Sequence, residues 1–100
     1  MTWRGEPLAN HKVNLYERDY GFDLDDRLNR TSTDRKGRFE ISGFEFEFFP
    51  IEPYLLVFTE CVREITCVAE IDVPPEAVVR GPVAPIFDMG TFDVFFRERE

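Results

Sequence analysis

The feature that most constrains this chain is the alternation of apolar and polar side chains in short runs that Pro and Gly interrupt. Residues 12–18 place Val13 and Leu15 on the same side, a period of two that is typical of a strand with one buried face. Residues 54–59 are apolar on both faces and predict a central strand. No window of ten residues has helical periodicity, so we expect an all-β chain.

The same pattern recurs elsewhere in the chain. It predicts a hairpin over 28–42, a strand over 67–73 and a last strand over 89–96. Within the hairpin, Asp34 suits the first position of a turn and Gly37 suits the fourth. The charged residues 97–100 are expected to be a solvated tail. Six to seven short antiparallel strands predict a β-sandwich that occupies the whole chain, 1–100, as one domain.

Charge and hydropathy argue against a nucleic-acid partner and against a membrane-spanning helix. The 20 acidic residues outnumber the 12 basic ones and give a net charge of −8, which repels a nucleic-acid backbone. No apolar run approaches the roughly 20 residues of a membrane-spanning helix. The first residues do not resemble a signal peptide, so we expect the leader of a secreted form to be missing from this chain.

The two cysteines, Cys61 and Cys67, are separated by five residues. One interpretation is a pair of reduced thiols in the core. The other is a disulfide across a hairpin, which would indicate an extracellular protein. A four-ligand zinc site is not expected, because the only other ligand of the usual kind is His11.

Several short segments follow one another in a characteristic order. They are Gly5-Glu6-Pro7-Leu8-Ala9, Lys12-Val13-Asn14-Leu15-Tyr16, Thr33-Asp34 with Gly37-Arg38-Phe39, Ile51-Glu52-Pro53 with residues 54–59, Cys61 and Cys67, Ile71-Asp72-Val73-Pro74, and Phe87-Asp88-Met89-Gly90-Thr91-Phe92. In this order and spacing they resemble the nematode transthyretin-like family over roughly residues 5–95. The resemblance implies a transthyretin-like, or prealbumin-type, β-sandwich that is secreted.

The resemblance also indicates a class of function. At least one family member bridges exposed phosphatidylserine and a phagocytic receptor. We therefore expect a secreted, non-enzymatic recognition module with a protein or lipid partner at the cell surface, and no cofactor. The first alternative is a carrier that holds a small hydrophobic ligand in an oligomer channel, as transthyretin does.

The second alternative is a hydrolase. The enzymes of this fold that hydrolyse 5-hydroxyisourate use several His residues, an Arg and a C-terminal Tyr-Arg-Gly-Ser. This chain has only His11, which is expected to be solvated, and near its end it has Phe95-Phe96-Arg97-Glu98. One His offers too few groups for acid–base chemistry of that kind, and no catalytic residue is assigned.

Two departures from the family concern the beginning of the chain. Family members commonly have a strand before the segment that starts at Gly5, and here almost nothing precedes it. A cysteine is also usual near the position of Trp3. These departures indicate either a chain whose first strand is truncated or a divergent family member, and in both cases we expect an exposed sheet edge.

A phenylalanine-rich segment is a candidate binding surface. Its alternation with Glu45 and Glu47 would either bury the rings in the core or leave an apolar stripe outside, and Trp3 could extend that stripe. The candidate residues are Phe44, Phe46, Phe48 and Phe49.

Two weaker sites are also expected. An acidic loop is a weak calcium candidate, although it lacks the glycine and closing glutamate of an EF-hand; its residues are Asp19, Asp23, Asp25 and Asp26. The triplet Asn29-Arg30-Thr31 is an N-glycosylation sequon, which would agree with secretion if Asn29 faces solvent.

Overall fold

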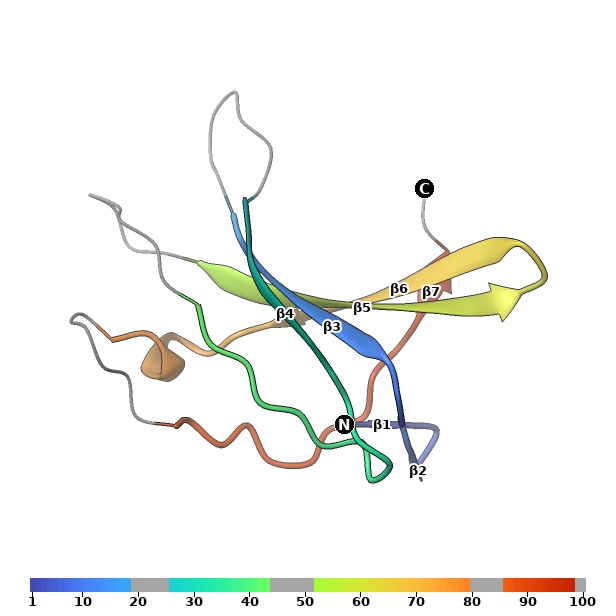
Figure 1. Cartoon of the computed structure of the whole chain (residues 1–100), viewed down its shortest axis with the longest axis horizontal. Coiled ribbons are helices and arrows are strands. Elements are labelled where there is room, and N and C mark those ends of the chain that lie inside the picture. Colours follow the sequence, from blue (N-terminus) through green and yellow to red (C-terminus); the bar gives the residue numbers. More distant parts are fainter. Residues whose placement is uncertain (19–25, 44–51, 80–85, 99–100) are drawn as a thin grey trace.

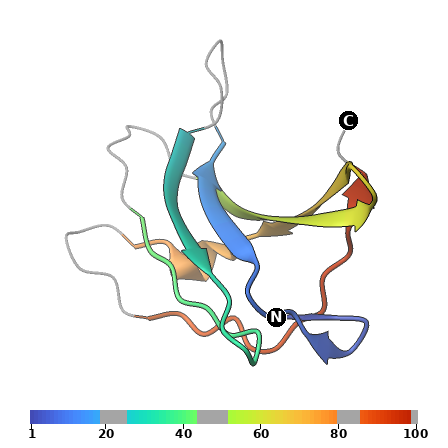
Figure 2. The ribbon, with the colours of Figure 1, turned by 45° about the vertical axis from the view of Figure 1, so that its right-hand side comes forward.

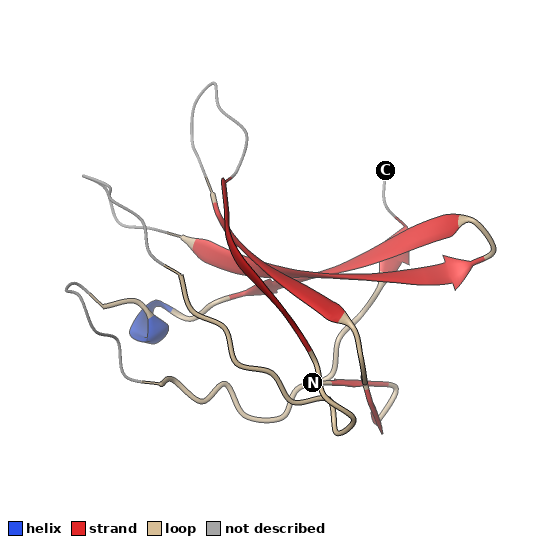
Figure 3. Ribbon diagram, viewed as in Figure 1, coloured by secondary structure: helices blue, strands red, loops and turns tan. Residues whose placement is uncertain are grey.

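The computed structural model describes residues 1–18, 26–43, 52–79 and 86–98. The fold is all-β, with one five-stranded antiparallel sheet in the order β4-β3-β5-β6-β7 and a small β1-β2 hairpin (Figure 1; Figure 3). The elements are β1 (Thr2–Trp3), β2 (Glu6–Pro7), β3 (Lys12–Glu17), β4 (Asp26–Ser32), β5 (Pro53–Val62), β6 (Ile65–Asp72), the 3-10 turn η1 (Pro75–Ala77) and β7 (Arg97–Glu98). In the described ranges, no helix has the length and apolar character needed to cross a bilayer.

Strand β5 lies at the centre of the sheet, as its apolar sequence predicts. It pairs with β3 on one side, where Leu15 lies opposite Leu55. On its other side it pairs with β6, where Val57 lies opposite Ala69. Because directly opposed residues share a face, these pairs define one continuous apolar surface, here called the inner face.

The core forms where this inner face is covered. Its buried members from the sheet are fully or almost fully inaccessible to solvent, and they are Val13, Leu15, Leu55, Val57 and Ala69. The cover consists of Met1, Leu8 and Val94, with Phe39, Ile41, Met89, Phe92 and Phe96 packed around them. At about 25 cal/mol per Å² of apolar surface, this contact between two layers is the main stabilising term.

The second layer of the sandwich is mostly irregular. Residues 38–43 and 86–96 run beneath the sheet as extended segments without strand ladders (Figure 2). The predicted last strand over 89–96 is therefore wrong as a strand, although Val94 and Phe92 do point into the core. Its backbone instead contacts the beginning of the chain: Thr2 donates to the Phe92 carbonyl at 2.9 Å, and Val94 donates to that of Thr2 at 2.8 Å.

The expected solvated tail is confirmed as solvated at Arg97 and Glu98, while residues 99–100 lie outside the described residues. Arg97 and Glu98 do not form a free tail, however, but the strand β7, which pairs with Cys67 and Val68 of β6. Both side chains are exposed. The reason is that an edge strand offers unpaired backbone groups, and these accept a neighbour whatever its side chains are.

The turn after β4 has the predicted chemistry. The Gly37 amide donates to the Asp34 carbonyl at 3.0 Å, and the Asp34 carboxylate accepts bonds from the Lys36 and Arg38 amides at 2.9 Å each. The Arg38 amide is the largest of the causes that lower the pKa of Asp34 below its ordinary value. The expected second hairpin strand does not form a ladder, because residues after Arg38 leave β4 to cover the core.

The β1-β2 hairpin fixes the start of the chain to its end. Its two loop residues have positive φ, 52° at Arg4 and 81° at Gly5, as a type I′ turn requires. Thr2 donates from its hydroxyl to the Asp93 carboxylate at 2.6 Å, and the Gly5 amide donates to the same oxygen at 3.2 Å. These bonds, that of Thr2 first, lower the pKa of Asp93.

Two glycines in the left-handed region test how closely these segments pack. A Cβ on Gly37 (φ 76°) would lie 2.3 Å from the Met1 carbonyl oxygen, whereas a Cβ on Gly5 meets nothing within 4 Å. We expect Gly5→Ala to lower the free energy of unfolding by about 1 kcal/mol through backbone strain alone. Gly37→Ala should cost about 3 kcal/mol, because it adds a clash. Urea denaturation measures both, and equal losses would contradict the close contact between Gly37 and Met1.

Candidate functional site

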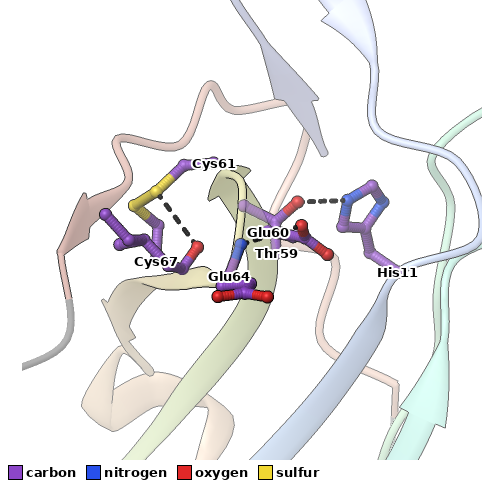
Figure 4. Close-up of a disulfide and its surroundings, with 7 residues drawn as sticks. His11, Thr59, Glu60, Cys61, Glu64 and Cys67 are labelled. Carbon is purple, nitrogen blue, oxygen red and sulfur yellow. Dashed lines mark hydrogen bonds between the residues drawn. A yellow bond between two sulfur atoms is a disulfide. The ribbon is translucent and has the colours of Figure 1, made fainter.

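A disulfide clamps the hairpin formed by β5 and β6. Cys61 and Cys67 are bonded, with their Cα atoms 5.6 Å apart, so the second interpretation of the cysteine pair is confirmed. Cys67 is buried on the inner side of β6, whereas Cys61 is exposed. The bond therefore joins the core to the projecting end of the hairpin, as Figure 4 shows.

Beyond the disulfide, the hairpin ends in a short turn with two apolar side chains in solvent. Val62 is 57% exposed and Ile65 is 38% exposed. Between them lie Arg63 and Glu64, and Glu64 has a φ of 64°. The Glu64 amide donates to the Glu60 carboxylate at 3.2 Å. A side-chain bond and a covalent clamp thus hold the tip in one conformation.

His11 lies beside this hairpin, where it bonds with both ring nitrogens. Nδ1 is 2.8 Å from the Ala9 carbonyl oxygen, and Nε2 is 3.2 Å from the Thr59 hydroxyl (Figure 4). Since a carbonyl only accepts, Nδ1 donates, and in the neutral ring Nε2 accepts from Thr59. The expectation of a solvated His11 is therefore wrong: the ring is half-buried and links the start of β3 to β5.

Aromatic rings close the end of the core near His11. Phe96 lies 6.5 Å from the His11 ring and makes an edge contact with Trp3 at 5.9 Å between centroids. The Arg4 guanidinium lies 4.7 Å above the Trp3 ring. Trp3 therefore packs on Phe96 at the rim of the core, with 40% of its surface still exposed.

Two of the predicted sites cannot be compared with the structure. The candidate apolar stripe, Phe44, Phe46, Phe48 and Phe49, lies outside the described residues. So do Asp19, Asp23 and Asp25 of the calcium candidate, while Asp26 begins β4. Within the ranges that are described, no three His, Cys, Asp or Glu side chains gather as a metal site would require.

Asn29 of the sequon is exposed at the edge of the sheet. Its Nδ2, the atom that would carry a glycan, donates to the Ser42 carbonyl at 2.6 Å. Its Oδ1 accepts from the Arg30 amide at 2.8 Å. Glycosylation would replace one of the two hydrogens on Nδ2 and leave the other for the bond that ties β4 to the second layer.

Sequence reasoning did not single out the other face of the sheet, here called the outer face. Tyr16 and Tyr54 stack there at 5.6 Å, and the Arg18 guanidinium lies 4.4 Å above Tyr54. Arg18 also pairs with Asp72 at 2.5 Å and Glu70 at 3.6 Å. The alternation of residues 12–18 does put Tyr16 on the face away from Val13 and Leu15. The pairing of β3 with β5, which the alternation does not reveal, is what brings Tyr16 next to Tyr54.

Comparison with known proteins shows one consistent similarity. The family model described as Transthyretin-like family matches residues 2–74. Transthyretin-like protein 5 of Caenorhabditis elegans is 33% identical over 98 residues, which cover 94% of this chain and 70% of that protein. Transthyretin-like protein 2 of the same organism is 35% identical over 103 residues, with the same two shares. No solved structure is significantly similar to this chain.

A shorter match is closer in sequence. Transthyretin-like protein 33 of Caenorhabditis elegans is 45% identical over 56 residues, or 56% of this chain and 39% of that protein. Transthyretin-like protein 46 is 32% identical over 93 residues, which make up 52% of its length. The chain thus spans between about two fifths and 70% of the length of these relatives.

The contribution of the disulfide to the free energy of unfolding can be measured. We expect the double variant Cys61→Ser/Cys67→Ala to lose about 2–3 kcal/mol of unfolding free energy, because a closed short loop restricts the unfolded chain. Adding a reductant to the wild-type chain should cause a similar loss and should leave the double variant unchanged. Equal unfolding midpoints for the oxidised wild type and the variant would contradict a stabilising role.

Proposed function

This chain belongs to the transthyretin-like family, and from that premise we propose that it is an extracellular, non-enzymatic recognition module. In this proposal it binds a protein at the cell surface through the tip of the β5-β6 hairpin. The observation that carries the proposal is the pair of exposed apolar side chains, Val62 and Ile65, held on a disulfide-clamped turn.

A clamped apolar tip favours binding for an energetic reason. A flexible loop loses conformational freedom when a partner orders it, at about 0.5–1.5 kcal/mol for each immobilised side chain. The Cys61–Cys67 bond and the contact between Glu60 and Glu64 order this tip in advance. Val62 and Ile65 then supply apolar surface for a partner to cover.

The chemistry around the tip favours a protein over a lipid surface as the partner. Glu60 precedes the two apolar residues and Glu64 lies between them, next to Arg63, which is the one base of the tip. The chain as a whole has a net charge of −8. An anionic membrane would repel this surface, whereas a protein can match both acids and the apolar pair.

An extracellular location agrees with two features. A disulfide persists in oxidising surroundings and is uncommon in the reducing cytosol, and this one closes the proposed binding loop. The sequon at Asn29 lies on an exposed part of β4, where a glycosylating enzyme could reach it.

The proposal of a non-enzymatic role is supported by the use of His11. Both of its ring nitrogens bond to groups of the fold, the Ala9 carbonyl and the Thr59 hydroxyl. A general base needs a ring nitrogen directed at a substrate proton. The carrier alternative requires an oligomer channel and is not supported by the shallow, mainly polar depression on one copy, which is lined by Thr31, Ser32, Asp34, Arg38, Phe39 and Glu40.

The test uses the fluorescently labelled, oxidised chain on intact cultured cells of Caenorhabditis elegans, the source of the relatives. We expect saturable binding that trypsin treatment of the cells abolishes, as a protein partner requires. The variant Val62→Ser/Ile65→Ser should lose most of this binding, because it removes the apolar pair and keeps the clamp.

Val79→Ser is the matched control, since Val79 is also exposed, at 43%, and lies outside the hairpin. It should bind as the wild type does. Absence of surface binding, or binding that the tip variant retains, would contradict the proposal. Cell binding that survives trypsin treatment, together with binding to phosphatidylserine vesicles, would point to a lipid partner instead.

A further inference from the structure

The outer face of the sheet is arranged in rows by the strand pairing. In one row Tyr16 lies between Arg27 of β4 and Tyr54 of β5, and Tyr54 is opposite Asp72 of β6. In the next row Asn14 lies between Arg30 and Leu56, and Leu56 is opposite Glu70. Each row therefore runs from a base on β4, across two central side chains, to an acid on β6.

The two ends of the rows carry opposite charge and are open to solvent. Arg27 and Arg30 are exposed, and among the described residues neither guanidinium has an ion-pair partner. Glu70 and Asp72 are also exposed and share the single guanidinium of Arg18. One Arg between two carboxylates leaves the β6 end of these two rows negative, while the β4 end is positive. Arg97 of β7, opposite Val68, lies beside the next row.

The centre of the outer face has two accessible side chains, Tyr16 and Leu56, which are half-buried. Tyr54, at 6% exposed, and the polar Asn14, at 7%, are buried, and Tyr54 lies beneath Arg18 and beside the ring of Tyr16. The segments that form the second layer pack on the inner face, against Val13, Leu15 and their neighbours (Figure 2). An apolar centre with charged margins is the usual composition of a protein interface.

We propose that the outer face binds a second copy of the chain, face to face, about a two-fold axis that lies in the interface parallel to the strands. This rotation puts β4 of one copy over β6 of the other. Arg27 then faces Asp72 of the second copy and Arg30 faces Glu70. Tyr16 lies over β5 of the second copy, next to the half-buried Leu56. Each contact occurs twice, as a two-fold interface requires.

The charge pattern selects this arrangement over the other face-to-face packing. A two-fold axis across the strands would put β4 over β4 and β6 over β6. Because this rotation reverses the strand direction, Arg30 would lie near Arg27 of the second copy and acids would face acids, which costs binding free energy. The alternation of base and acid across each row thus specifies both the partner and its orientation.

The size of the face sets the expected affinity. Four strands about 4.8 Å apart and six residues long cover about 400 Å² on each copy, or about 800 Å² in total, which is below the roughly 1,200–2,000 Å² of stable specific interfaces and within the size of weak, transient ones. We therefore expect a weak dimer, with a dissociation constant of about 10 μM to 1 mM.

The test is sedimentation velocity of the oxidised chain from about 10 μM to 1 mM, the expected range. The wild type should shift from monomer to dimer as its concentration rises. Arg30→Glu and Glu70→Arg should each weaken the dimer about tenfold or more, because every attractive pair at these positions becomes a repulsive one. An equimolar mixture of the two variants should dimerise as the wild type does. In the mixed dimer the two introduced side chains face each other as an acid and a base, and the unchanged Arg30 and Glu70 form the other contact.

Arg35→Glu is the matched control, because it makes the same change of charge in an exposed turn away from the outer face. It should dimerise normally. A wild type that stays monomeric to 1 mM, an Arg30→Glu chain that dimerises normally, or a mixture that does not recover would each overturn the proposal. The tip variant Val62→Ser/Ile65→Ser should dimerise normally, so this proposal and the proposed function can fail separately.

Discussion

Burial of the inner face of β3, β5 and β6 is the interaction on which the other features of this fold depend. Val13, Leu55 and Val57 are almost completely inaccessible to solvent, and they belong to strands whose pairing leaves no freedom in which face they present. A one-residue change of register would turn all of them outward. Once that surface exists, some segment of the chain must cover it, and the irregular stretches after Arg38 and before Arg97 do so.

The parts of the fold that follow from local chemistry were predictable from the sequence. A run such as residues 54–59 has no polar side to expose, so it belongs at the centre of a sheet, and the structure places β5 there. The turn at residues 34–37 depends on local groups, because the Asp34 carboxylate accepts the Arg38 amide and the Gly37 amide donates to the Asp34 carbonyl. The resemblance to the transthyretin-like family and the β-sandwich class were also confirmed.

The parts that depend on distant contacts were not predictable. Residues 89–96 alternate like a strand, but within the described part of the chain their backbone bonds to other strands are those to Thr2, and so the pattern indicates contact with the core without a ladder. His11 was expected in solvent because nothing in its neighbours reveals Thr59, 48 positions further along the chain. The rows of the outer face have the same origin: the bases on β4 and the acids on β6 are brought to opposite ends by strand pairing, and the proposed hairpin tip lies beyond these rows. The two proposed binding surfaces, the hairpin tip and the outer face, thus consist of side chains that do not belong to the inner face.

The most direct test of the account compares two neighbouring leucines in the central strand. Leu55 is 1% exposed on the inner face, and Leu56 is half-buried on the outer face. Urea denaturation at low micromolar concentration should show that Leu55→Ala loses about 3 kcal/mol of unfolding free energy and that Leu56→Ala loses about 1 kcal/mol or less. Equal losses, or a greater loss for Leu56→Ala, would mean that the core lies on the other side of the sheet and would contradict the account.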